Sequence, residues 1–336
     1  MPAPLPGPNG VNTTRKGGLL VLLLSVVYLL VSYVLIGFRS EQLVLVGLCN
    51  ACYFLSETTR RLIIGFSIFV VFWILYDYMK AFPNYAYRAV DIAQLYSAEK
   101  SLFGIPFQNK SLTPNEFWLI NHNAFLDVVC GIFYLCWVPV PLAFAGYLFF
   151  QNRPMFFEFS LTFLLVNLLG FVVYYLHPAA PPWYVQQHGF AFQPLTMGST
   201  AGLSRFDALF GVGVFASIYA KNSNIFAAMP SLHCAYPVIV LYYADRNRSG
   251  VFTQIFATIM GGIWFAAVYT SHHYVLDVLA GIAVALVGMV LVRLLLAKSR
   301  TFNRFIARFL QLTAASSADR SAFTTVVVDR KLKDEG

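Results

Sequence analysis

Charged residues are scarce in this sequence. Of its 336 residues, only 11% are Asp, Glu, Lys or Arg, while 58% are hydrophobic. A soluble domain carries about 25% charged residues, so the shortage argues against one and is typical of a chain that crosses a membrane several times. The net charge of +8 is not gathered into a long Lys/Arg run with interleaved aromatic residues. It therefore indicates basic cytoplasmic loops rather than a nucleic-acid partner.

Cysteine is also rare, and the usual metal motifs are missing. Among five cysteines, Cys49 and Cys52 form a lone C-x-x-C with no second pair or nearby histidine, so we interpret them as ordinary thiols. No H-E-x-x-H motif is present. The first apolar run follows a Pro- and Gly-rich start and precedes no small-residue cleavage pattern. It is therefore predicted to be a retained helix rather than a signal peptide.

Long apolar runs are what the sequence has in abundance. Most of them reach the roughly 20 residues that cross about 30 Å of hydrocarbon. The eight segments are 18–38, 41–56, 61–79, 124–150, 156–176, 231–244, 252–271 and 274–297. Two are short: 41–56 can also be a re-entrant or surface helix, and 231–244 can span only if its start lies below the interface. The predicted fold class is an all-α, polytopic membrane helix bundle.

Basic residues between the segments predict the orientation of the chain. If all eight segments cross, every basic cluster lies on one face, and both termini are cytoplasmic. The clusters are Arg15–Lys16, Arg60–Arg61, Arg153, Arg246 with Arg248, and Lys298 with Arg300 and Arg304. If 41–56 does not cross, the N-terminus changes sides. Stretch 88–103 has helical apolar spacing and is predicted to lie in the membrane interface.

Four regions are predicted along the chain. They are a polar N-terminal tail (1–17), N-terminal transmembrane helices (18–79), a catalytic membrane domain (80–297) and a polar cytoplasmic tail (298–336). The catalytic domain includes two long loops on the non-cytoplasmic side, 80–123 and 177–230. Within the tail, 301–312 is predicted to form a short amphipathic helix.

Three ionisable residues stand at the starts of two apolar segments. His233 begins 231–244, and His273 and Asp277 begin 274–297. His273 and Asp277 are four residues apart, so on a helix they share one side. An aspartate bonded to one imidazole nitrogen fixes the tautomer and directs the other nitrogen outward as a nucleophile. A second histidine from a facing helix can then handle the leaving-group proton.

The three residues also fit a structural role, a zinc site or a proton-coupled transporter. Interfacial histidines and an aspartate at a helix start can be purely structural, but ionisable groups at membrane depth are functional by default. Two nitrogens and a carboxylate can hold zinc, yet no further acidic ligand accompanies them, so no metal and no cofactor is predicted. A proton-coupled lipid transporter would normally place such groups near the bilayer midplane rather than at helix mouths.

Four motifs carry a resemblance to a known family. They are HPAAPPWY (177–184), GSTAGLSRFDALFG (198–211), NSNIFAAMPSLH (222–233) and YTSHHYVLDVLAG (269–281). In order and spacing they resemble the inositol phosphorylceramide synthase branch of the type 2 phosphatidic acid phosphatase superfamily. Weaker similarity extends back through FPN (82–84) and the 114–150 stretch.

The resemblance implies a fold, a reaction and residue roles. It implies a six-helix phosphatidic acid phosphatase-like core with additional N-terminal helices. The reaction would move a phosphoinositol headgroup from a phosphatidylinositol-type lipid to ceramide or a similar lipid hydroxyl, through a phosphohistidine, with release of diacylglycerol. His273 would be the nucleophile, Asp277 its orienting partner and His233 the acid/base. The alternative is a lipid phosphatase that uses the same triad with water as the acceptor.

The sequence departs from the phosphatase pattern at its cationic anchors. Gly146 stands where the first signature has lysine, and Ala266 and Ala267 replace the Ser-Arg pair of the third. Arg153-Pro154 in QNRP is predicted to lie on the cytoplasmic face and not in the site. Fewer cations suit a phosphodiester, which carries less charge than a monoester, and so favour the transferase.

Four further residues are predicted to contact substrate. Arg205 and then Lys221 are the candidates for a phosphate-binding cation. His177 and Tyr184, in the HPAAPPWY motif, are candidates for the headgroup or for the wall of the substrate site, although both also suit a plain interfacial role. The predicted partners are the donor lipid, a ceramide-like acceptor and the bilayer. A bacterial inner membrane is favoured over a Golgi membrane, with the site on the non-cytoplasmic face.

Overall fold

The computed structural model describes residues 8–220 and 224–314. Helices dominate these ranges, and the one sheet in them is a small hairpin, so the prediction of an all-α membrane bundle is confirmed. The helices are α1 (Pro8–Ile36), α2 (Ser40–Leu55), α3 (Glu57–Tyr78), α4 (Ala93–Phe103), α5 (Pro114–Ile120), α6 (Ala124–Leu135), α7 (Pro139–Gln151), α8 (Arg153–Leu176), α9 (Pro182–His188), α10 (Ser204–Phe210), α11 (Val214–Tyr219), α12 (Leu232–Arg246), α13 (Val251–Tyr269), α14 (Val275–Lys298) and α15 (Arg300–Thr313).

Six stretches of the described chain are long and apolar enough to cross a membrane. They are Lys16–Ile36, Glu57–Ala81, Ala124–Gln151, Arg153–Leu176, Val251–Tyr269 and Val275–Lys298. Helix α2, with 16 residues, is shorter. Helix α12 has 15 residues, about 22 Å at 1.5 Å per residue, which is also short of a full crossing. The two segments predicted to be short are therefore short helices.

The apolar segment predicted at 124–150 is not one continuous helix. It is interrupted at Cys136–Val138, between α6 and α7. Pro139 occupies the first turn of α7, where its missing N–H is harmless, but its ring would obstruct a helix that arrived from α6. The break was missed because the hydropathy of the segment stays high across it.

Short polar side chains set where several helices begin. Asn123 caps α6 by accepting the N–H of Leu126, and Asn152 caps α8 by accepting that of Met155. Asp91 accepts the N–H groups of Gln94 and Leu95. This contact explains why the helix predicted within 88–103 begins at Ala93.

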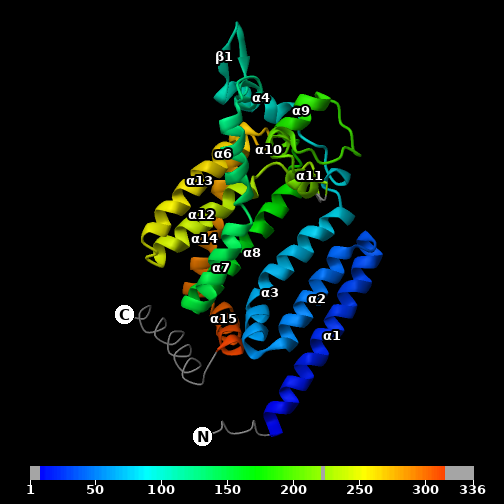
Figure 1. Cartoon of the computed structure of the whole chain (residues 1–336), viewed down its shortest axis with the longest axis vertical. Helices are drawn as coiled ribbons and strands as arrows, with labels where there is room; N and C mark the ends of the chain where they lie inside the picture. Colours follow the sequence, from blue (N-terminus) through cyan, green and yellow to red (C-terminus); the bar gives the residue numbers. More distant parts are fainter. Residues whose placement is uncertain (1–7, 221–223, 315–336) are drawn as a thin grey trace. The chain divides into compact units, whose positions relative to one another are not determined.

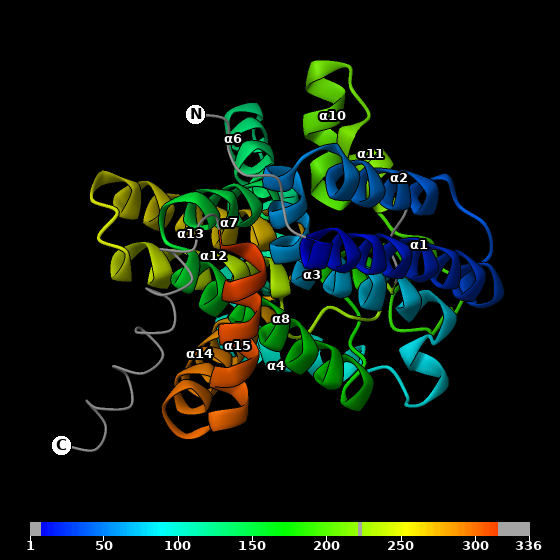
Figure 2. The same cartoon turned by 90° about the horizontal axis from the view of Figure 1, so that it is seen from below.

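The chain divides into two compact units, at Ala81/Phe82 and at Arg300/Thr301. In the first unit, α1, α2 and α3 lie side by side (Figures 1 and 2). Polar side chains join them: Asn50 on α2 donates to Ser25 on α1 at 2.8 Å, and the hydroxyls of Ser32 and Tyr78 lie 2.9 Å apart. Helix α1 starts at Pro8, earlier than the predicted end of the polar tail at residue 17.

The second unit, residues 82–300, holds the long helices α8, α13 and α14 together with the shorter α6, α7 and α12. Short helices α4, α9, α10 and α11 and the hairpin gather at one end of this bundle (Figure 1). The hairpin pairs β1 (Ile105–Phe107) with β2 (Lys110–Leu112). Its turn residues Gln108 and Asn109 have φ of 44° and 64°, as a two-residue hairpin turn requires. This hairpin was not predicted.

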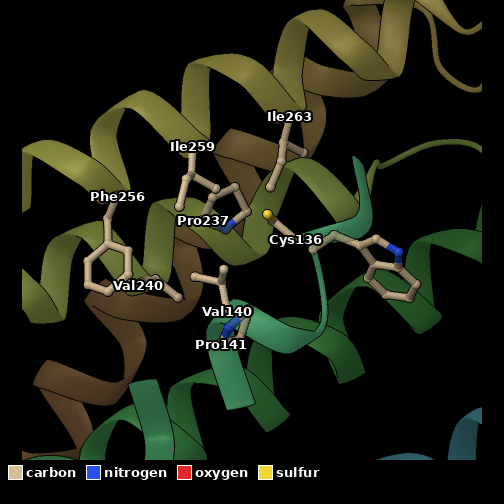
Figure 3. Close-up of a pocket in the computed structure, with 9 residues that line it drawn as sticks. Cys136, Val140, Pro141, Pro237, Val240, Phe256, Ile259 and Ile263 are labelled. Carbon is tan, nitrogen blue, oxygen red and sulfur yellow. The ribbon is translucent and has the colours of Figure 1, made fainter. Parts of the chain in front are cut away.

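A small apolar gap lies where α7, α12 and α13 meet, beside the α6–α7 break (Figure 3). Cys136, Pro237 and Ile263 are among the residues around it, and its volume of about 10 Å³ is that of a single water at most. Its lining is almost entirely carbon. The gap is a packing defect, and the polar chemistry of the unit lies elsewhere.

Candidate active site

The N-terminal ends of α12 and α14 are joined by backbone contacts. Ser231 donates its N–H to the carbonyl of Asp277 at 2.9 Å, and its hydroxyl caps α12 by accepting the N–H of Cys234. Gly281 makes this approach possible, because a Cβ there would collide with the carbonyl of Ser231. The Pro-Ser-Leu-His motif and the later HHYVLDVLAG motif therefore meet through their main chains.

The two predicted histidines lie in direct contact. Nδ1 of His233 and Nε2 of His273 are 2.9 Å apart, within hydrogen-bond distance. Trp137, from the α6–α7 break, packs edge-on against the ring of His233, with centroids 4.4 Å apart. The structure thus brings together two groups that are 40 residues apart in sequence, and an aromatic wall covers one of them.

A main-chain carbonyl fixes the tautomer of His273. Its Nδ1 lies 3.1 Å from the carbonyl oxygen of Ala228 and 3.6 Å from Oδ2 of Asp277. A carbonyl can only accept, so Nδ1 carries the proton and Nε2 presents a lone pair. His233 must then donate from its own Nδ1. The nearer partner of Nδ1 is Ala228, whereas sequence reasoning named Asp277 alone.

Burial keeps His273 neutral. The side chain is 5% exposed. Loss of hydration lowers the pKa of His273 to about 4, and the Ala228 carbonyl opposes that change only in part. An imidazole with this pKa is unprotonated at neutral pH, as a nucleophile must be.

Asn115 holds the main chain on either side of the histidine segment. It is fully buried on α5 and donates to the carbonyls of Val268 and His273, at 2.8 and 2.9 Å. Sequence reasoning missed it, because a single asparagine 158 residues away has no spacing signature. Its position just after a Thr-Pro helix start is the one local sign that its side chain is directed inward.

Two carboxylates occupy the N-terminus of α14. Asp277 accepts the N–H of Tyr274 at 2.8 Å. Glu99, on α4, is fully buried and accepts the N–H groups of Val275 and Leu276 at 2.9 and 3.1 Å. Burial raises the pKa of Glu99 to about 7, although its two backbone hydrogen bonds pull the other way. Glu99 was missed because the interfacial helix was judged by its apolar face.

The loops around the site form a small parallel ladder. Asp91, Ala179 and Ala227 pair as successive bridges, and Ala179 exchanges backbone hydrogen bonds with Phe226 and Ala228. Asn84, from the FPN stretch, also donates to the carbonyl of Phe226 at 2.8 Å. Three separated stretches of chain therefore position the carbonyl that His273 contacts.

Comparisons with known proteins identify the family of the chain. Residues 93–291 match the family described as the PAP2 superfamily. The chain is also 45% identical over 302 residues to the phosphoinositol dihydroceramide synthase of Bacteroides thetaiotaomicron, covering 89% of this chain and 98% of that one. The chain belongs to the PAP2 superfamily. The predicted resemblance is confirmed.

Two fungal proteins match over a shorter length. The inositol phosphorylceramide synthase of Candida albicans is 28% identical over 248 residues, or 70% of this chain and 49% of its own. The catalytic subunit of the Saccharomyces cerevisiae enzyme is 28% identical over 224 residues, or 63% of this chain and 52% of its own. This chain spans about half the length of these fungal relatives. No solved structure matches it.

Arg205, the first predicted phosphate-binding cation, is held by an ion pair. Arg205, on α10, pairs through Nε with Asp127 at 2.6 Å, and the Tyr269 hydroxyl donates to the same carboxylate at 2.8 Å. Nη2 of Arg205 is buried without a hydrogen-bond partner among the described residues. It lies beside Gly202, where a Cβ would come within 3.0 Å. Lys221 lies outside the described residues.

His177 and Tyr184, the other two predicted substrate contacts, interact with neighbouring loop residues. His177, at the end of α8, is half exposed and has Nε2 3.4 Å from Oδ2 of Asp91. Tyr184 is buried, donates to the Ala191 carbonyl and accepts the N–H of Gln193, each at 2.8 Å. The hydroxyl of Tyr184 is thus used to hold the following loop.

Arg153 of the QNRP stretch lies far from the histidines. It begins α8, whereas His177 follows the other end of this 24-residue helix, about 36 Å away. Where the side chains are described, no three His, Cys, Asp or Glu residues gather in a metal-ligating arrangement. The five cysteines are free thiols.

Proposed function

We propose that this protein transfers a phosphoinositol headgroup from phosphatidylinositol to the hydroxyl of ceramide or a closely related sphingoid lipid, releasing diacylglycerol. One observation carries the chemistry: a neutral His273, with its tautomer fixed, presents Nε2 to a protonated Nδ1 of His233 at 2.9 Å. The names of the bacterial and fungal relatives support the assignment of these substrates. The protein is accordingly a lipid phosphotransferase of the membrane.

The reaction proceeds in two displacements. The donor phosphate enters between the two imidazoles and replaces their mutual hydrogen bond. The negative charge of the bound phosphate favours the imidazolium form of His233. Nε2 of His273 attacks phosphorus, the bond from phosphorus to the diacylglycerol oxygen breaks, and the His233 imidazolium gives its Nδ1 proton to that oxygen and becomes a neutral imidazole. In the second step, His233 takes the proton of the acceptor hydroxyl. The acceptor oxygen bonds to phosphorus, and the bond from Nε2 to phosphorus breaks.

Asp277 acts on the intermediate more than on the resting enzyme. Once Nε2 is phosphorylated, the ring keeps its Nδ1 proton and gains a positive charge. The carboxylate of Asp277, 3.6 Å from Nδ1, opposes that charge, while the Ala228 carbonyl holds the proton in place. Oδ1 of Asp277 is buried without a partner among the described residues, so this carboxylate keeps free accepting capacity.

Arg205 is the cation that we assign to the phosphate. Its Nε is neutralised by Asp127, but its unpaired Nη2 still offers N–H donors next to the histidine segment. A buried guanidinium nitrogen without a partner is expensive, and a phosphodiester oxygen would satisfy it. One partly neutralised cation matches the single negative charge of a phosphodiester.

The protein is a multi-pass membrane protein, and we place the site on the non-cytoplasmic face of a bacterial inner membrane. In residues 82–300, the histidines lie at the starts of α12 and α14, while Arg246 and Lys298 lie at their ends. Arg153 also lies at the end of α8 away from the site. The positive-inside rule therefore assigns the basic end to the cytoplasm.

The test is a reconstituted assay with phosphatidylinositol, with and without ceramide. We expect inositol phosphorylceramide and diacylglycerol in equal amounts, and no turnover by His273→Ala. Gln254→Ala, a change at an exposed side chain on α13, should keep wild-type activity. Release of free inositol phosphate together with diacylglycerol, but with no inositol phosphorylceramide, would instead establish the hydrolytic alternative, in which water is the acceptor. An active His273→Ala variant would refute the nucleophile assignment.

A further inference from the structure

A cavity of about 830 Å³ lies in the loop region between α8 and α12. This volume is in the range of small-molecule sites. Its walls come from the end of α9, the loop that follows, and α11. The described residues that line it are Gln187, His188, Phe192–Thr200, Ala216, Tyr219 and Ala220.

The walls of the cavity are tied to the segment that leads into His273. Next to the lining, Trp183 donates its backbone N–H to the Ser271 carbonyl at 3.0 Å. The side-chain amide of Gln186 donates to the Ser271 hydroxyl, also at 3.0 Å. Gly202, just past the lining loop, donates its N–H to the Thr270 carbonyl at 2.9 Å. The cavity is therefore positioned by the two residues that immediately precede the His272–His273 pair.

His272 contacts both the wall of this cavity and a ring that packs on His233. Its ring packs on Tyr219, which lines the cavity, with centroids 4.5 Å apart, and on Tyr134 at 5.3 Å. Tyr134 in turn contacts the ring of His233 at 5.4 Å. His272 is 4% exposed, and its ring also interacts with the backbone of Ser199, which lines the cavity. This contact ties His272 to the cavity wall.

The lining suits a neutral polyhydroxylated ligand. Its polar members are amides, hydroxyls and one imidazole, and none of the described lining residues is Lys, Arg, Asp or Glu. Amides and hydroxyls both donate and accept, as the hydroxyls of a polyol do, whereas a phosphate calls for cations. Burial also lowers the pKa of His272 well below its ordinary value, against a smaller effect of backbone carbonyls that include Ser199. His272 is thus a neutral partner too.

We propose that this cavity binds the inositol ring of the donor lipid, with His272 beside the ring and next to the His233–His273 pair. The assignment rests on the proposed function, since it names the subsite that selects the headgroup. Phosphorus then lies at the histidines and the polyol on the side of Tyr219. The acyl chains remain outside the cavity.

The test compares two donors at a fixed ceramide concentration. Wild-type protein and a Gln187→Ala/Gln193→Ala variant are assayed with phosphatidylinositol and with phosphatidylglycerol. We expect the variant to raise KM for phosphatidylinositol at least fivefold, with an unchanged KM for ceramide, and to lose most of the preference over phosphatidylglycerol. Gln254→Ala, an exposed glutamine on α13, is the matched control and should behave as wild type.

The outcomes separate this proposal from the proposed function. If wild-type protein moves no headgroup from phosphatidylinositol, both the proposed function and the assignment of the subsite are refuted. If wild-type protein is active and the variant keeps its KM and its donor preference, the subsite alone is overturned. Thr200→Val, nearly isosteric and also in the lining, repeats the measurement should the double variant fail to elute as a single species in size-exclusion chromatography.

Discussion

At the scale of single residues, the site is built around one imidazole nitrogen. Nδ1 of His273 faces the carbonyl of Ala228 at 3.1 Å and the carboxylate of Asp277 at 3.6 Å. At the longer distance, Asp277 still stabilises a positive charge on the ring. A charge on the ring interacts with a carboxylate over several ångströms in a buried site, whereas a hydrogen bond to a carbonyl demands contact. The two partners therefore divide orientation and charge between them.

Asp277→Asn separates these two roles. The amide oxygen still accepts the N–H of Tyr274, and Ala228 still fixes the tautomer, so the fold should persist. We expect kcat to fall by roughly 10²–10⁴-fold, because the charge that opposes the phosphorylated imidazole is gone. Steady-state rates with phosphatidylinositol and ceramide measure the effect. A variant with wild-type kcat would show that Ala228 alone is sufficient.

The sequence was sufficient to predict the histidines and Asp277, but not their supports. Ionisable residues at the starts of apolar segments are conspicuous, because membrane segments contain so few charges. Ala228 acts through its backbone, which has no residue-type signature. Asn115 and Glu99 come from distant short helices, and nothing in the sequence shows which helix start they will meet.

At the scale of elements, α14 is the helix on which the site depends. Its N–H groups at Tyr274, Val275 and Leu276 are all taken by carboxylates, from Asp277 and Glu99. Negative charge at this end is favourable for the helix dipole. Two buried carboxylates so close together are nevertheless costly to ionise, which is reflected in the raised pKa of Glu99.

Glu99→Gln should separate stability from activity. The pKa of Glu99 is raised from 4.5 to about 7 on folding, so the folded protein binds more protons than the unfolded chain between these values. The contribution of Glu99 to stability is therefore lost as pH rises through about 7. Between pH 5 and pH 8, the free energy of unfolding of the wild type should fall relative to that of the variant by on the order of 1–3 kcal/mol. Thermal unfolding measures the difference.

The activity of the same variant should move in the opposite direction. A glutamine amide offers one oxygen where the carboxylate offers two, so one N–H of the first turn of α14 loses its acceptor. We expect kcat to fall about tenfold, and Glu99→Asp to recover part of it. Equal pH dependence of unfolding in wild type and variant would show that Glu99 does not titrate in this range.

Gly281 tests the close approach of α12 and α14. A Cβ at this position would collide with the Ser231 carbonyl, and that backbone group cannot move without shifting the start of α12 and His233. We expect Gly281→Val to destabilise the protein by about 3 kcal/mol or more and to abolish activity. Gly261→Val, on α13, is the control, because a Cβ there meets nothing within 4 Å. The measurement is thermal unfolding in detergent.

At the scale of the whole molecule, hydropathy and charge predicted the membrane bundle but not its interruptions. The apolar segments became helices close to their predicted bounds. The break at Cys136–Val138 and the small hairpin depend on local backbone geometry rather than on hydropathy. In their described parts, both long loops contain short helices, and side chains and carbonyls from these loops contact the histidine segment.

The orientation in the membrane can be tested by cysteine labelling. In a variant that lacks the five native cysteines, Leu195→Cys and Asp245→Cys mark the two ends of the second unit, and both native side chains are exposed. An impermeant maleimide should label Leu195→Cys in intact spheroplasts, but Asp245→Cys only after permeabilisation. The reverse pattern would place the histidines in the cytoplasm.

The carbonyl of Ala228 has a consequence for how the protein tolerates change. The atom that sets the tautomer of His273 belongs to the main chain, so no side-chain substitution can delete it. A mutational scan would score Ala228 only for bulk, because its side chain is 3% exposed. The function of the carbonyl is instead spread over the FPN, HPAAPPWY and NSNIFAAM stretches that hold it. We therefore expect substitutions in all three stretches to reduce activity slightly, because each stretch helps to position this one carbonyl oxygen.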